Sequence, residues 1–190
     1  LDNARLYTRT RNRAEELSVL NAFSRVLAST LDSERLIKAA LDQITERFRA
    51  DSVALMQEED KPEGEGQAEQ AHARTLYLVQ GRFQGVYQRS SLRIPVEDSL
   101  TGRVYAERKP MLIGDVQTDP RFFVEANDRL APRPHAMMAV PLIVQDRVTG
   151  VLLVASQEIG LYDEEDLQTL QAFAATLAVA MASLPPWLCL

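Results

Sequence analysis

Leucines at heptad spacing predict a long helix at the start of the chain. The stretch from Leu1 to Ala28 contains no Gly or Pro, and one seam carries Leu6, Leu17, Leu20, Leu27 and Leu31. A seam of this kind is typical of helices that pair with another helix. At about 1.5 Å per residue the helix would be roughly 40 Å long, more than a small domain needs. The alternative interpretation is a frayed N-terminal extension, because the first turns are rich in arginine.

Helices are predicted in four further places. Asp32 is placed to cap a helix that ends near Ala50 and has one apolar face. A helix is also predicted over 99–108, and the pair Asp119–Pro120 is typical of the start of a short helix. The final helix begins after a capping Asp163, and its apolar residues repeat at spacings of three and four: Leu167, Leu170, Ala174, Leu177, Met181 and Leu184.

Between these helices lie short runs of β-forming residues bounded by turn residues. They predict strands over 52–57, 75–81, 85–96, 110–116, 136–144 and 149–156. The last two are close enough to form a hairpin, and Pro141 predicts a bulge or an edge position in the first of them. The order of elements indicates an α+β fold with a mainly antiparallel central sheet and the N- and C-terminal helices packed on one face.

Composition narrows the class of protein. The chain has 190 residues, of which 46% are apolar, enough for one sizeable core. The net charge is −6, which argues against nucleic-acid binding, and no apolar run approaches the roughly 18 residues of a membrane span. Most of the charge lies in one acidic stretch, 57–72, which we expect to be a loop without fixed structure. A single cysteine, Cys189, fits a reducing compartment and hence the cytoplasm.

No catalytic constellation is present. The sequence has no phosphate-binding GxxxxGK, no GxSxG nucleophile turn, no HExxH metal pair and no cysteine cluster for zinc. Only two histidines occur, His72 in the acidic stretch and His135 at the end of a proline-rich loop before a buried strand. His135 could face a pocket as a hydrogen-bonding or haem-ligating group, or it could be a loop histidine bonded to backbone. We therefore predict no enzyme and no metal site, and the cofactor stays unknown.

Several motifs in the second half of the chain occur together. They are SLTGRVYAERKPMLIGDVQTDPRFF from Ser99, AMMAVPLIVQDRVTGVLLVAS from Ala136, and LYDEEDLQTLQAFAATLAVAMA from Leu161. In combination they resemble the GAF domain, a small-ligand sensor module of histidine kinases, phosphodiesterases, phytochromes and transcription activators. The resemblance covers about residues 30 to 184. It implies the α+β fold predicted above and a regulatory function.

The resemblance also implies where a ligand would lie, between the sheet and the helices and loops after the third strand. The candidate ligand-binding residues there are Tyr77, Tyr105, Phe122, Phe123, His135 and Met137. The cyclic-nucleotide branch of the family is not favoured. Among the residues that characterise that branch, this sequence matches only at Asp166. Attachment of a bilin chromophore, and the sulfoxide reductase activity of other relatives, need cysteines that the single Cys189 does not supply.

We expect three parts: a linker helix over 1–30, a GAF-like domain over 31–184 and a tail over 185–190. The hypothesis is a cytoplasmic regulatory sensor from a larger signalling protein, such as a two-component histidine kinase, with other domains in the same polypeptide. It would bind a small molecule and relay the signal through a homodimer of terminal helices, with no nucleic acid and no membrane involved. The alternative is a dimerisation or spacer module without a ligand. The dimer contacts would come from Leu17, Leu20, Leu27, Leu170, Leu177 and Met181.

Overall fold

The computed structural model describes residues 20–21, 33–58, 74–89, 92–97, 99–119 and 133–182. Its centre is a seven-stranded antiparallel sheet, which in this described part of the chain has the order β3-β2-β1-β7-β6-β5, with β4 also paired to β2. The strands are β1 (Ser52–Glu58), β2 (Thr75–Phe83), β3 (Val86–Gln88), β4 (Arg93–Pro95), β5 (Met111–Ile113), β6 (Ala136–Val144) and β7 (Arg147–Ser156). The predicted α+β class with an antiparallel sheet is confirmed.

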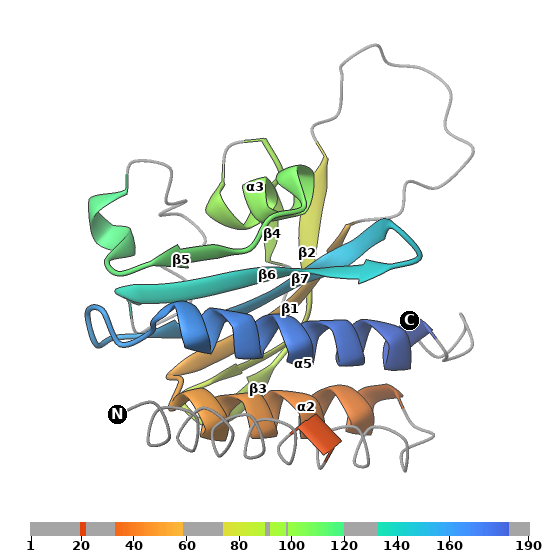
Figure 1. Ribbon diagram of the computed structural model, residues 1–190, viewed down its shortest axis with the longest axis horizontal. Helices are drawn as coiled ribbons and strands as arrows, with labels where there is room; N and C mark the ends of the chain where they lie inside the picture. The colour runs from red at the N-terminus through yellow and green to blue at the C-terminus, as the bar shows by residue number, and fades with distance from the viewer. Residues whose placement is uncertain are drawn as a thin grey trace, which may run out of the picture.

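The helices divide between the two faces of the sheet (Figure 1). Two long helices, α2 (Ser33–Phe48) and α5 (Glu164–Ala182), lie side by side on one face. The short α3 (Leu100–Glu107) and the 3-10 helix η1 (Val116–Thr118) pack on the other face. Two separate apolar layers follow from this arrangement, one on each side of the sheet.

The larger apolar layer lies between the sheet and the helices α2 and α5. The apolar stripes predicted from helical spacing are the sides of α2 and α5 that pack on the central strands of the sheet. Phe173 of α5 packs edge to face on Phe48 of α2, with ring centroids 6.1 Å apart. Fully buried members of this layer include Leu36, Leu41, Ile44, Leu55, Met138, Leu152 and Leu170.

The second layer lies under α3. Val104 and Tyr105 of this helix pack on the sheet, against a layer that includes Met56, Leu78 and Phe83. Gly102 brings the helix against the segment after β4: a Cβ at this position would lie 2.2 Å from the carbonyl oxygen of Val96. The close approach therefore requires glycine.

Local signals set the ends of two helices as predicted. The Ser99 hydroxyl accepts a hydrogen bond from the amide of Gly102 at 3.0 Å and caps α3. At the start of α5, Asp163 Oδ1 accepts from the amide of Asp166 at 2.9 Å, and the Asp166 carboxylate accepts from the Asp163 amide at 3.4 Å. This reciprocal arrangement is a capping box with aspartate in both positions.

The β6–β7 hairpin is also confirmed. Its turn is the pair Gln145 and Asp146, both with positive φ, which suits the twist of a two-residue hairpin. Pro141 lies beyond the end of the neighbouring strand, because β5 pairs with β6 only as far as Ala139. The ladder with β7 shifts register just after it, at Leu142. Pro141 thus sits at a local edge, one of the two positions that its missing N–H allowed.

One strand prediction is corrected. The run over 85–96 forms two short strands, β3 and β4, which pair with opposite ends of β2. The short helix expected from Pro120 onward falls on residues outside the described part. Just before those residues the chain makes η1, which is capped by the carboxylate of Asp115 accepting from the Gln117 amide at 3.1 Å.

Three other predictions also fall largely or wholly outside the described residues. Of the predicted N-terminal helix, Leu20 and Asn21 are described, and both are helical. Of the acidic stretch 57–72, Gln57 and Glu58 form the end of β1 and the rest is not described, and neither is the tail 185–190. No described helix combines the length and the hydropathy needed to cross a bilayer.

Candidate functional site

The layer under α3 holds three of the predicted ligand-binding residues. Tyr105 projects from α3 into this layer and is largely buried. Its hydroxyl donates a hydrogen bond to Glu58 Oε2 at 2.6 Å, at the last position of β1. Burial, and then the neighbouring Glu58 carboxylate, raise the pKa of Tyr105 to about 12, because both disfavour the phenolate. Tyr105 is therefore a neutral hydrogen-bond donor fixed between α3 and the central strand.

Met137 lies in the same layer. It is buried on β6 and packs with Leu100 of α3, Val116 of η1 and Ala155 of β7. Its neighbours are apolar, so this part of the layer offers apolar and polarisable contacts to a ligand and no charge.

His135 directly precedes β6 and lies beside Ser156 at one end of β7, whereas the Tyr105 hydroxyl lies beside Val148 near the other end. Its Nδ1 lies 2.9 Å from Asp115 Oδ1. The loop is tied down on both sides: the His135 amide donates to the Ser156 carbonyl at 2.7 Å, and the Val116 amide donates to the His135 carbonyl at 2.8 Å. Both side chains of the pair remain partly accessible to solvent.

The pair has a defined protonation pattern. A carboxylate only accepts, so Nδ1 of His135 is the donor, and the neutral imidazole then carries its free lone pair on Nε2. The hydrogen bond from His135 holds the pKa of Asp115 below its usual range. The arrangement can therefore accept a hydrogen bond from a ligand at Nε2. Among the described residues, no group of three or more His, Cys, Asp and Glu side chains is arranged for a metal ion.

The structure separates Tyr77 from this group. Leu76 and Leu78, its neighbours on β2, face the α3 layer, so the alternation of a strand places Tyr77 on the opposite face. There its hydroxyl donates to Gln57 Oε1 at 3.3 Å. The prediction that Tyr77 shares a site with Tyr105 is wrong. Phe122 and Phe123 lie outside the described residues.

Two polar partners were absent from the predicted site. Asp115 belongs to the motif that carried the resemblance, but nothing in the sequence paired it with a histidine twenty positions later. Glu58 stands at the boundary of the acidic stretch and looked like part of a solvated loop. In both cases the pairing of strands in the sheet brings the two partners together, and no local sequence pattern reveals that pairing.

The predicted dimer contacts on α5 need correction. Leu170 and Leu177 are both 0% exposed and pack on their own sheet, so they are not available to a second chain. Met181 is half-buried against the same layer. Leu20 is half-buried, and Leu17 and Leu27 lie outside the described residues. The apolar stripe of α5 belongs to the core because the sheet needs it there.

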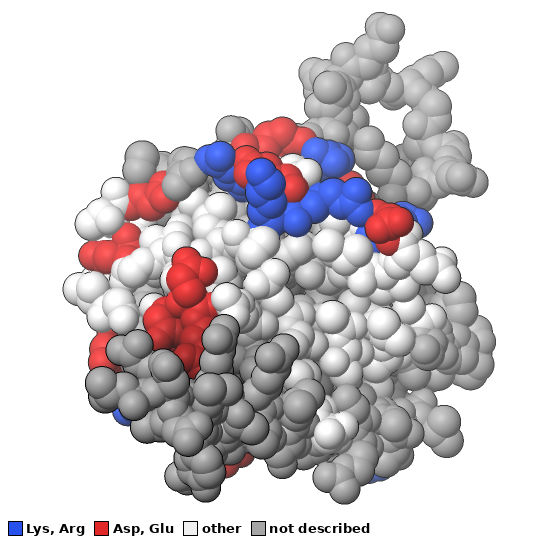
Figure 2. Space-filling model, viewed as in Figure 1, with Lys and Arg blue, Asp and Glu red and all other residues white. Residues whose placement is uncertain are grey.

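The outward side of α5 has a different character. It carries Gln168, Gln171, Ala175, Val179 and Ala182, and Val179 is 60% exposed. No charged residue occurs from Leu167 to Ala182. Figure 2 shows a broad uncharged surface in the middle of this face of the molecule. An ordinary solvent-exposed helix carries charged residues on its outer side.

The fold and the sequence can now be compared with known proteins. The sequence profile of the GAF domain matches residues 30–182. This chain belongs to the GAF domain family. GAF domains are regulatory sensor modules of signalling proteins, and the expected family and fold are thereby confirmed. No curated protein matches the chain.

Solved structures share the GAF fold at low sequence identity. The GAF domain of a phosphoenolpyruvate-protein phosphotransferase from Coxiella burnetii is 20% identical, with a TM-score of 0.68 over 88% of this chain and 92% of that one. The nlh2 GAF domain of A. aeolicus in an inactive state is 19% identical, with a TM-score of 0.67 over 90% of this chain and 97% of that one.

An enzyme is among the similar structures. The free methionine-R-sulfoxide reductase of Neisseria meningitidis, in complex with its substrate, is 21% identical, with a TM-score of 0.67 over 89% of each chain. GAF domains are generally regulatory, but the fold by itself does not decide against catalysis. Function has to be argued from the residues of this chain.

Proposed function

We propose that this GAF domain is a regulatory sensor that binds a small molecule at the edge of the α3 layer. The observation that carries the proposal is the Asp115–His135 pair, with 2.9 Å between Oδ1 and Nδ1. The carboxylate fixes the imidazole, and the free Nε2 becomes an oriented hydrogen-bond acceptor beside an apolar layer. A ligand with an apolar body and one N–H or O–H donor suits this arrangement.

The proposal is tested by a thermal-shift screen of nucleotides, haem and small metabolites on the whole chain. A compound that raises the melting temperature is then titrated against His135→Ala and Asp115→Asn. We expect the shift to be lost in the first variant and reduced in the second. His72→Ala is the matched control, because His72 is the other histidine of the chain and should leave the shift unchanged. A shift that is the same in all variants would show that the ligand binds elsewhere.

The signal would be relayed through a homodimer of terminal helices. The support is the uncharged outer side of α5 together with the leucine seam of the predicted N-terminal helix, which both suit contact with a second copy of the chain. In this arrangement α5 would cover the sheet with its inner side and contact the second chain with its outer side. The domain would act in the cytoplasm, within a signalling protein such as a two-component histidine kinase.

A ligand-free dimerisation module is the second candidate, and the α5 surface favours it equally. Sedimentation of the wild type should show a dimer at tens of micromolar, and Val179→Glu should shift it to a monomer. Val86→Glu is the control, because Val86 is equally exposed at 59% but lies on the edge strand β3. A monomeric wild type contradicts both candidates. If the wild type is a dimer and no compound in the screen changes its melting temperature, the ligand-free dimerisation module is the function that remains.

A further inference from the structure

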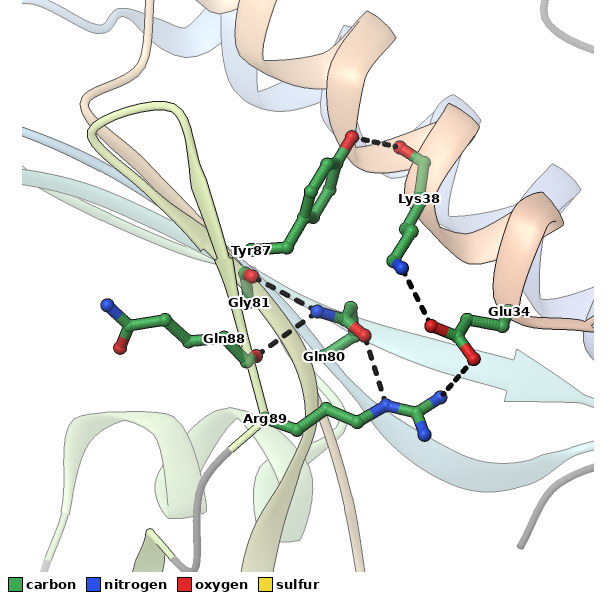
Figure 3. A network of polar contacts seen from close by, with 7 residues as sticks. All are labelled: Glu34, Lys38, Gln80, Gly81, Tyr87, Gln88 and Arg89. Atoms are coloured by element: carbon green, nitrogen blue, oxygen red, sulfur yellow. Dashed lines mark hydrogen bonds and ion pairs between the residues drawn. The ribbon is translucent and has the colours of Figure 1, made fainter.

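One side of α2 carries a row of alternating charge. Glu34, Lys38 and Asp42 follow one another at one residue per helical turn, which places them along the same side of the helix. Glu34 Oε1 and Lys38 Nζ pair at 2.7 Å within the row. The row is separate from the apolar stripe beneath α2, and it faces the hairpin of β2 and β3 (Figure 3).

The hairpin presents a matching set of side chains. Arg89 Nη2 lies 3.6 Å from Glu34 Oε2, and Arg82 Nε lies 2.9 Å from Asp42 Oδ1. Between these two ion pairs, Lys38 Nζ stands 5.4 Å from the centre of the Tyr87 ring. The Tyr87 hydroxyl also donates to the Lys38 carbonyl at 3.4 Å. Each arginine therefore faces an acidic residue, and the aromatic ring faces the lysine.

A buried residue holds one of the arginines. Gln80 is 2% exposed, and a bulge in β2 at Val79 turns it toward the α2 face, opposite Leu55. Its Oε1 accepts from Arg89 Nε at 3.1 Å, while its Nε2 donates to the Gln88 carbonyl at 3.2 Å (Figure 3). Isolated surface ion pairs contribute little to stability because their side chains lose conformational entropy on pairing. Gln80 already holds Arg89 in place, so this entropy loss is smaller for the pair with Glu34.

The apolar stripe of α2 is less selective about position along the helix axis at some of its residues. Ile37 and Leu41 are buried four positions apart and have similar size. A displacement by one turn, about 5.4 Å, would exchange these two aliphatic side chains, but it would also bring Leu36 or Ile44 to the place of the fully buried Ala40. The charged row does not tolerate the same displacement. Movement in one direction brings Lys38 opposite Arg89, and movement in the other brings it opposite Arg82.

We propose that this charged row locks the position of α2 along the β2–β3 hairpin, so that helix and hairpin move as one body. The other face of β2 contributes Leu76, Leu78 and Phe83 to the layer that contains Tyr105. A change in that layer would thus reach α2 through β2, as a tilt or rotation and not as a slide by one turn. The lock does not depend on a ligand at His135.

The lock is tested by the distance between spin labels at Arg35 on α2 and Val86 on β3, both exposed. Cys189 is replaced by serine so that the labels are the only thiol adducts. Lys38→Glu leaves both ion pairs with the hairpin intact but removes the repulsion that opposes sliding. We expect a second population displaced by about 5 Å, one helical turn. Lys38→Arg keeps the charge and should retain the single wild-type distance.

Should Lys38→Glu fail to fold, Lys38→Gln provides the same test in weaker form, with a distribution that broadens toward the displaced distance. A single unchanged distance in the folded glutamate or glutamine variant overturns the proposal. The apolar contacts, with Phe48 against Phe173, would then be what positions α2.

Discussion

The carboxylate of Asp115 and the imidazole of His135 meet at 2.9 Å although twenty positions separate them in the chain. The antiparallel pairing of β5 and β6 brings them together, because one residue follows the first strand closely and the other precedes the second. The contact joins the cap of η1 to the start of β6 and orients one free nitrogen. It is the basis of the proposed ligand site.

Replacement of Asp115 by asparagine should change how stability depends on pH. The hydrogen bond from His135 lowers the pKa of Asp115 below 3.8, so the carboxylate stabilises the fold above that pH. This contribution is lost as the pH falls through the folded-state pKa. In urea unfolding, Asp115→Asn should be less stable than wild type at pH 5 to 7, and the two curves should converge as the pH falls through the folded-state pKa of Asp115. A constant difference across the range would show that the charge of Asp115 plays no part.

Tyr105→Phe should destabilise the domain by about 1–2 kcal/mol, because it leaves the Glu58 carboxylate without the hydroxyl that lies 2.6 Å away. Tyr77→Phe is the control, with a longer bond of 3.3 Å and a cost of about 0.5 kcal/mol. The pH profile gives a second measurement. The pKa of Tyr105 is raised to about 12, so wild-type stability should fall as pH rises from 10 toward 12. The raised pKa values of Tyr87 and Tyr162 contribute to the same fall, so a smaller fall in Tyr105→Phe than in wild type would confirm the contribution of Tyr105.

Leu170→Ala should remove about 2–5 kcal/mol from the free energy of unfolding, because the side chain is fully buried and leaves a cavity. Val179→Ala, two and a half turns further along α5 but on its outer side, should change stability by about 0.5 kcal/mol or less. Urea titration of both variants measures the difference. Equal effects would contradict the assignment of Leu170 to the buried side of α5 and Val179 to the exposed side.

Gly102→Ala should destabilise the domain although alanine is the better helix former. The added methyl would lie 2.2 Å from the Val96 carbonyl oxygen, so α3 would have to move away from the chain after β4. We expect a cost of about 1–3 kcal/mol. Gly114→Ala is the control, since its nearest neighbour would be 4.0 Å away. Thermal unfolding of the two variants tests the difference, and a stabilised Gly102→Ala would contradict the close packing.

The helices and most strands were predictable because their signals are local. Asp163 and the repeats after it define α5, and Ser99 defines the start of α3, without reference to the rest of the chain. The split between β3 and β4 was not predictable, because it depends on which part of β2 each segment meets. The bulge at Val79, which turns Gln80 toward α2, also arises only from pairing with β1.

The candidate site was predictable only in part, for a related reason. Helical spacing finds Leu170 and Leu177, but it does not say whether an apolar stripe meets its own sheet or a second chain. Alternation along β2 places Tyr77 on the face opposite α3 and Tyr105, but only once Leu76 and Leu78 are known to face α3. His135 was identified from its position in a loop, whereas its partner Asp115 could be identified only from the pairing of β5 with β6.

The most direct test of the ligand site follows the imidazole nitrogens of His135 by NMR in ¹⁵N-labelled protein. Before any addition, the account predicts that Nδ1 carries the proton that the Asp115 carboxylate accepts. Titration with the nucleotides, haem and metabolites of the screen should then move the His135 Nε2 resonance with at least one compound, while the resonances of His72 stay in place. An unprotonated Nδ1 in the free protein, or a His135 resonance that no compound moves, would contradict the account.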